Sequence, residues 1–97
     1  MKIKFLKIAQ IELEDAIEYY EYQVPKLGYR FLKEIEESLT RIVKFSDAYP
    51  KIGKYTRRCL VKDFPYAILY YCEYDEIIIT AVAHQHRNPV NYKNRLK

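Results

Sequence analysis

Apolar side chains change their spacing several times along the chain, and each spacing predicts a type of element. Residues 2–6 alternate apolar side chains with lysines, as a half-buried strand requires. Residues 8–23 carry apolar side chains at every third or fourth position and have acids early, which suits the positive end of a helix dipole. The helical spacing returns over residues 31–43, after Pro25 and Gly28. We therefore expect one strand and then two helices, which their short connection makes antiparallel.

Three further segments are rich in β-branched and aromatic residues, namely Tyr55–Lys62, Tyr66–Glu73 and Ile77–His84. Only a few residues connect them, so neighbouring strands should form an antiparallel meander. The whole order predicts an α+β domain in which two antiparallel helices pack on one face of a four-stranded antiparallel sheet, followed by a short C-terminal tail. A chain of 97 residues has the size of one domain, so we expect residues 1–97 to fold as a single unit.

The two faces of the meander separate when the turns are centred on Phe64-Pro65 and Tyr74-Asp75. The face expected under the helices carries Arg57, Cys59, Val61, Tyr66, Ile68, Tyr70, Ile77, Ile79, Ala81 and Ala83. The opposite face, called the open face below, carries Arg58, Leu60, Lys62, Ala67, Leu69, Tyr71, Thr80, Val82 and His84. No predicted helix is left to cover the open face, so we expect a partner or a substrate there unless the tail folds over it.

Composition narrows the class of protein. The chain has 11 tyrosines, a surplus that suits a buried surface continuing into a binding surface, because the ring can pack while the hydroxyl stays hydrated. The longest apolar run, Ile77–Ala83, is too short to span a bilayer, and lysines interrupt the N-terminus before a signal-peptide core can form. We expect a cytoplasmic protein without membrane association. Cys59 and Cys72 lack partners at metal-ligand spacing, so we expect no metal, no cofactor and no disulfide.

Positive charge gathers in the second half of the chain. Residues 1–48 hold 8 Lys and Arg against 9 Asp and Glu, whereas residues 49–97 hold 9 against 4. The stretches 51–62 and 84–97 contain no acid. Such stripes attract phosphates or an acidic partner, although solvated charge without a ligand produces the same pattern.

Several side chains that transfer protons or bind phosphate fall near the end of the last predicted strand. A metal-free ribonuclease needs an acid, a base and a positive clamp on the phosphate. His84 or His86 is a candidate acid or base, and Tyr92 is a candidate second proton donor or base-stacking ring. The candidates for the clamp are Arg58, Lys62 and Arg87.

Structural explanations compete with this catalytic one. The expected faces place Arg58 and Lys62 beside His84, but a histidine at a strand end usually only hydrogen-bonds a backbone group. Arg58 can simply be solvated. Tyr92 can be a ring that covers the edge of the sheet.

Four stretches of this sequence, in this order and spacing, resemble the RelE/ParE toxin superfamily. They are residues 9–20 in the first helix, 28–32 at the start of the second, 57–60 with 64–66 in the meander, and 81–89 near the end. Together they look like the ParE-like proteins often labelled plasmid stabilisation proteins, and the resemblance covers nearly the whole chain.

The resemblance implies a toxin of a bacterial type II toxin-antitoxin system, which inhibits growth when free and is neutralised by its antitoxin. RelE-like members cut messenger RNA on the ribosome, whereas ParE-like members act on DNA gyrase. Arg58, Lys62, His84 and Tyr92 fall near positions that the RNA-cutting members use, but Ala67 stands where those members place a strand arginine.

We therefore expect gyrase as the target. Two alternatives remain: a ribosome-dependent messenger RNA endoribonuclease, and a non-toxic antitoxin-bound regulator or decayed homologue.

Overall fold

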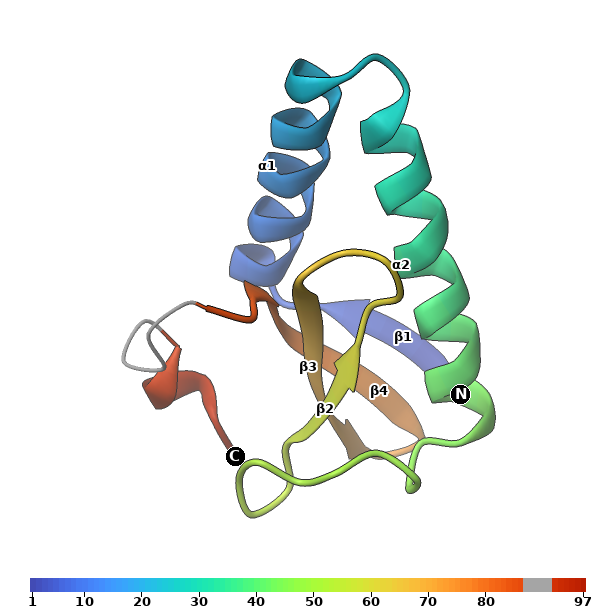
Figure 1. The fold of residues 1–97 in the computed structure, drawn as a ribbon. Coiled ribbons are helices and arrows are strands. Elements are labelled where there is room, and N and C mark those ends of the chain that lie inside the picture. Colours follow the sequence, from blue (N-terminus) through green and yellow to red (C-terminus); the bar gives the residue numbers. More distant parts are fainter. Residues whose placement is uncertain (87–91) are drawn as a thin grey trace.

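The computed structural model describes residues 1–86 and 92–97, and Figure 1 traces the chain. Its elements are β1 (Lys2–Phe5), α1 (Lys7–Gln23), α2 (Leu27–Lys44), β2 (Arg57–Leu60), β3 (Tyr66–Glu73), β4 (Glu76–His84) and the short 3₁₀ helix η2 (Lys93–Arg95). The α+β class and the order of elements are confirmed. Within the described ranges, neither α-helix is both long and apolar enough to cross a membrane.

The sheet is mixed rather than antiparallel. Its strands lie in the order β1-β4-β3-β2, and β1 runs parallel to β4, with Lys2 opposite Glu76 and Phe5 opposite Ile79. The other two pairs are antiparallel, as expected. The prediction of a fully antiparallel sheet is therefore wrong for β1. Short turns force only the two strands that they join to run antiparallel. Strand β1 is connected to the other strands by the two helices instead, so no short turn fixes its direction.

A β-bulge in β4 reverses the faces of the residues that follow it. Leu69 pairs with Ala81 but Tyr70 pairs with Ile79, which leaves Thr80 as the extra residue. The register beyond Thr80 differs from the predicted one for this reason.

Four residues after the bulge consequently lie on the face opposite to the predicted one. Val82 packs in the helix-side core, and His84 pairs with Tyr66, which packs against that core. Ala81 packs on the open face, and Ala83 pairs with the open-face residue Ala67. The predicted faces of Ala81, Val82, Ala83 and His84 are therefore wrong, because a single inserted residue flips the side-chain alternation of a strand.

Helices α1 and α2 cover one face of the sheet and form the main core with it (Figure 1). The helices contribute Ala9, Ala16, Phe31, Ile35 and Ile42, and the sheet side contributes Cys59, Val61, Phe64, Ile68, Tyr70, Ile77, Ile79 and Val82. Burial raises the pKa of the Cys59 thiol, so this cysteine stays a neutral core side chain.

The connection between the helices explains where α2 begins. The Glu21 carboxylate accepts hydrogen bonds from the backbone N–H groups of Lys26 and Gly28, at 2.8 and 3.1 Å. These groups lie at the N-terminus of α2, where N–H groups have no partner within the helix. Gly28 also permits close helix contact, since a Cβ there would lie 2.5 Å from the Ile17 carbonyl oxygen. Helix α2 therefore starts near Leu27, with α1 packed tightly against it.

The open face is partly covered by the tail, defined here as residues 92–97. Ala67, Leu69 and Ala81 form a small second cluster, against which Ile52, Tyr92 and Leu96 pack. The sequence analysis expected a partner or a substrate on the open face unless the tail folds over it. Part of the tail does fold over it, through Tyr92 and Leu96.

Candidate functional site

His84 and His86 are the predicted site residues that the structure brings together. Their ring centroids are 5.3 Å apart, and the Tyr66 ring lies edge-on to His84 at 5.2 Å. The backbone N–H of His86 donates a hydrogen bond to Nδ1 of His84, at 3.1 Å. One nitrogen of His84 is thus engaged by the local backbone, which is the structural role that strand-end histidines usually have.

Arg58 does not lie with these histidines. It is opposite Leu69 in the sheet and therefore belongs to the open face, whereas His84 belongs to the helix side. Lys62 follows β2 in an exposed turn. The predicted sharing of one face by Arg58, Lys62 and His84 is wrong, because the bulge at Thr80 moves His84 to the other side.

Tyr92 packs against the open-face cluster, which includes Ala67. Ala67 is 4% exposed. This packing fits the structural alternative for Tyr92, a ring that covers the sheet. Arg87 lies outside the described residues.

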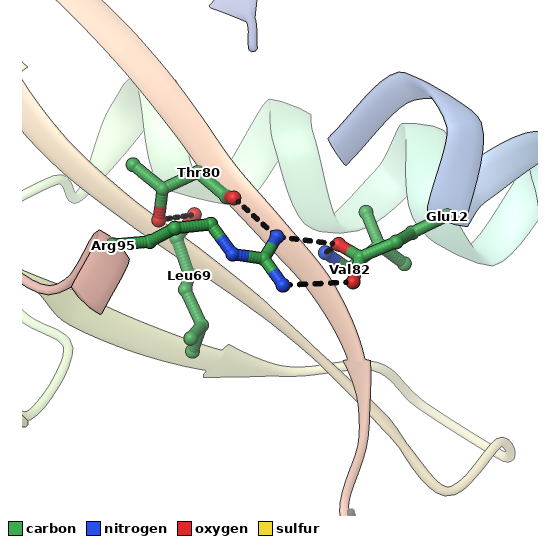
Figure 2. A network of polar contacts seen from close by, with 5 residues as sticks. All are labelled: Glu12, Leu69, Thr80, Val82 and Arg95. Atoms are coloured by element: carbon green, nitrogen blue, oxygen red, sulfur yellow. Dashed lines mark hydrogen bonds and ion pairs between the residues drawn. The ribbon is translucent and has the colours of Figure 1, made fainter. Parts of the chain in front are cut away.

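A buried ion pair that the sequence analysis missed joins the tail to α1 (Figure 2). Arg95 Nη1 donates to Glu12 Oε1 at 3.0 Å, and Nη2 donates to Oε2 at 3.1 Å. The side chains of Arg95 and Glu12 are only 13% and 11% exposed. Two parallel bonds between a guanidinium and a carboxylate are among the strongest polar contacts in proteins.

The same two side chains also satisfy the edge of β4. Strand β1 ends at Phe5, opposite Ile79, so the edge of β4 has no strand partner beyond that point within the described residues. Arg95 donates to the Thr80 carbonyl at 3.0 Å, and the Val82 N–H donates to Glu12 at 3.1 Å (Figure 2). The ion pair therefore replaces the missing stretch of strand, since buried backbone groups need partners.

A signal for Glu12 was present in the sequence. It lies on the buried stripe of α1, between Ala9 and Ala16, where an acid requires a partner if the helix packs by that stripe. Nothing in the sequence identified the partner of Glu12, because Arg95 lies in a basic tail whose composition is typical of a solvent-exposed segment.

The end of the tail is fixed to the loop before β2. The main-chain oxygen of Lys97 accepts hydrogen bonds from the N–H groups of Tyr55 and Thr56, at 2.6 and 2.9 Å. The Lys97 N–H donates to the Thr56 hydroxyl at 2.8 Å, and Thr56 is fully buried. The tail is thus held at Glu12 and at Thr56.

An apolar groove of about 250 Å³ lies between β1 and α2. It is lined by Ile3, Leu39, Thr40, Val43 and Lys44. Lys2 and Lys4 of the adjacent strand are exposed. Because β1 is at the edge of the sheet that the structure describes, its outer backbone groups pair with no other strand of that sheet.

No group of three or more His, Cys, Asp or Glu side chains that could hold a metal ion occurs among residues 1–86 and 92–97.

Comparison with known proteins places this arrangement among toxins. A model of the family described as the ParE toxin of the type II toxin-antitoxin system, parDE, matches residues 3–89. A solved structure titled chromosomal ParDE TA system from P. aeruginosa is similar in fold, with a TM-score of 0.69 and 14% sequence identity, over 87% of this chain and 95% of that one. A search of curated proteins found no match.

Proposed function

Because this chain belongs to the ParE toxin family of type II toxin-antitoxin systems, we propose that it arrests bacterial growth when free, is neutralised by a cognate antitoxin and acts on DNA gyrase. The family match over residues 3–89 carries the proposal. Gyrase is a cytoplasmic target, so the same proposal places the toxin in the cytoplasm.

The surroundings of Ala67 support gyrase over messenger RNA as the target. A nuclease of this superfamily needs a positive clamp on the scissile phosphate, and losing one such group costs about 10²-fold in rate or more. Here Ala67 and Leu69 lie beneath the tail, and Arg58 is on the face opposite His84. These positions disfavour a shared phosphate site for Arg58 and His84.

Two assays on the purified toxin test the target. We expect inhibition of gyrase-catalysed supercoiling and no cleavage of ribosome-bound messenger RNA. Replacing the proton-transfer candidates singly, by His84→Ala, His86→Ala or Tyr92→Phe, should leave toxicity unchanged. Cleaved transcripts with normal supercoiling, abolished by any of these changes, would instead identify a RelE-like endoribonuclease.

Expression in bacteria tests toxicity itself. Induced alone, the chain should arrest growth, and co-expression of the antitoxin encoded beside it should restore growth. Normal growth at high yield of folded protein, without antitoxin, would contradict the proposal and favour the non-toxic regulator.

The groove between β1 and α2 is the surface we propose for the antitoxin. A partner gains affinity by adding a strand to a free edge or by placing apolar side chains in a groove, and this region offers both. Lys44 lines the groove, and Lys2 and Lys4 are exposed on the adjacent strand, so an acidic segment with apolar side chains fits the charge of this region.

Matched substitutions test this surface. Val43→Asp places an acid in the groove and should weaken the toxin-antitoxin complex by tenfold or more, about 1.4 kcal/mol. Val24→Asp makes the same change at an exposed position between the helices and should have little effect. Arg58→Glu with Lys62→Glu tests the open face instead; if only that pair weakens the complex, the antitoxin binds there.

A further inference from the structure

A cavity of about 360 Å³ lies at the end of β3 remote from the two histidines. Its walls are Tyr55, Tyr71, Cys72, Glu73 and Lys97, and we call it the two-tyrosine pocket. His84 pairs with Tyr66, at the other end of β3. Tyr66 and Glu73 are seven strand positions apart, roughly 23 Å at about 3.3 Å per residue. The pocket is therefore separate from the pair His84 and His86.

The pocket has a fixed wall where the tail meets the loop before β2. The main chain of Lys97 is bound to Tyr55 and Thr56 by the hydrogen bonds described above. This anchoring holds the Lys97 side chain over the sheet, where its Nζ lies 5.1 Å from the centroid of the Tyr71 ring. A wall built from main-chain bonds is already in place before a ligand arrives, which lowers the cost of binding.

Both tyrosines of the pocket have an ammonium group at the ring. Lys97 is placed over Tyr71, and Lys54 Nζ lies 5.4 Å from the centroid of the Tyr55 ring. Such cation-π contacts hold the two positive charges beside the cavity. The Tyr55 side is accessible, because this residue is 58% exposed.

One accessible ring, that of Tyr55, defines the ligand chemistry together with two lysine ammonium groups and one carboxylate. Tyrosine rings stack on nucleobases, lysine ammonium groups bind phosphates, and a glutamate accepts a hydrogen bond from an exocyclic amino group such as that of cytosine. We propose that the two-tyrosine pocket binds a nucleotide unit, an aromatic base with its phosphate, as part of single-stranded nucleic acid. Its volume is near the lower end for small-ligand sites, as one nucleotide unit requires.

The adjoining chain supports a strand rather than a free nucleotide. Lys51, Lys54, Arg58 and Lys62 are exposed, and the stretch 51–62 contains no acid. Phosphates next to the bound base can therefore contact exposed basic side chains of this stretch, of which Lys54 lies beside the pocket. This inference does not depend on gyrase being the target of the toxin.

Fluorescence anisotropy with the full chain tests the inference. The probe is a labelled oligodeoxycytidine of about 12 nucleotides, within the site sizes of single-strand grooves, at about 0.15 M salt. The double variant Lys54→Glu and Tyr55→Leu removes a cation and an exposed ring, and should weaken binding about tenfold or more. Lys97→Glu, at another residue that lines the pocket, should weaken binding in the same direction.

A second lysine-tyrosine pair on α2 provides the matched control. Lys33 Nζ lies 5.7 Å from the Tyr29 ring, and Tyr29 is 61% exposed. The double variant Lys33→Glu and Tyr29→Leu changes the net charge equally, so it measures the effect of charge alone. We expect it to weaken binding less than about threefold, since it removes no pocket contact. Thermal unfolding checks that both double variants fold.

The remaining outcomes either assign the ligand or overturn the proposal. If the oligonucleotide binds and cytidine monophosphate competes only weakly, the ligand is single-stranded nucleic acid. If the monophosphate binds as tightly as the oligonucleotide does per site, the pocket is supported but its ligand is a free nucleotide. Glu73→Gln should reduce the preference for cytidine over thymidine oligomers. Failure of the wild-type chain to bind either probe, or equal losses in both double variants, would overturn the inference.

Discussion

The two faces of the sheet are covered by different kinds of contact. On the helix side, side chains such as Phe31, Ile35 and Ile42 pack against the sheet and are almost fully buried. On the open face, the short tail covers the small cluster of Ala67, Leu69 and Ala81, and polar contacts at its two anchor points hold it.

This difference predicts two kinds of sensitivity. Apolar packing is spread over many contacts, so each core side chain contributes in proportion to its buried volume. The tail depends on a few directional bonds, so one substitution at an anchor can release it. Substitutions on the two faces should therefore differ in how much they lower the free energy of unfolding and in whether they release the tail.

The largest loss of stability should come from the helix side. Phe31 is fully buried. The centroid of its ring lies 5.0 to 5.1 Å from the ring centroids of Tyr20, Phe64 and Tyr66. Phe31→Ala should lower the free energy of unfolding by about 3–5 kcal/mol in urea titrations. Tyr29→Ala, at an exposed site two residues earlier, should cost no more than about 0.5 kcal/mol. A similar effect of both would refute the assigned core.

The next largest effect should come from the tail anchor. Arg95→Met leaves the Glu12 carboxylate buried and the Thr80 carbonyl without this donor, which should cost about 2–3 kcal/mol. Faster amide hydrogen exchange at the open face should accompany the loss, because the tail covers it.

A double variant sharpens the test of this anchor. Adding Glu12→Leu to Arg95→Met removes the uncompensated charge but also the acceptor of the Val82 N–H, so the double variant should lose less stability than the sum of the two single effects. A double variant that loses the sum of both single effects would show that the two side chains act independently.

A smaller effect is expected at Tyr70, whose hydroxyl donates a hydrogen bond to the Ser46 carbonyl at 2.7 Å. Tyr70→Phe keeps the ring and removes this bond, which should cost about 1 kcal/mol at neutral pH. The variant should remain folded, and its unfolding midpoint in denaturant should fall without a change of slope.

The same residue predicts a dependence on pH. Burial raises the pKa of Tyr70 far above its ordinary value, so the unfolded chain loses this proton first. The contribution of Tyr70 to the free energy of unfolding is complete below a pH of about 10 and declines as the pH rises further. Unfolding measured from pH 8 upward should show this decline, and Tyr70→Phe should reduce its slope.

The smallest effect on stability is expected at Arg58. Its side chain is exposed, so Arg58→Glu should change the free energy of unfolding by no more than about 0.5 kcal/mol. A larger loss in thermal or denaturant unfolding would mean that this arginine supports the open face structurally.

Sequence patterns predicted the elements well because local spacing determines them. The helices and the meander follow from apolar periodicity and short turns, and both appear at nearly the predicted positions. The parallel β1–β4 pair and the bulge at Thr80 depend on contacts between distant segments. No local pattern encodes those contacts, so the faces of Val82 and His84 were assigned wrongly.

The candidate site was harder to predict for the same reason. His84 and His86 are neighbours in the chain, and the structure brings their rings together. Arg58 and His84 come from different strands, so one inserted residue was enough to separate them. The Glu12–Arg95 pair joins residues near the two ends of the sequence, where pattern analysis has least power.

The parallel pairing of β1 has a consequence for the order in which the chain folds. Lys2 needs Glu76 as its neighbour, so β1 must wait for β4, the last strand of the described sheet along the chain. Contacts between such distant segments slow folding, because the intervening loop must close first. During translation, the helical hairpin can form early, but the completed sheet cannot. The nascent toxin should therefore complete its sheet only after β4 has been synthesised.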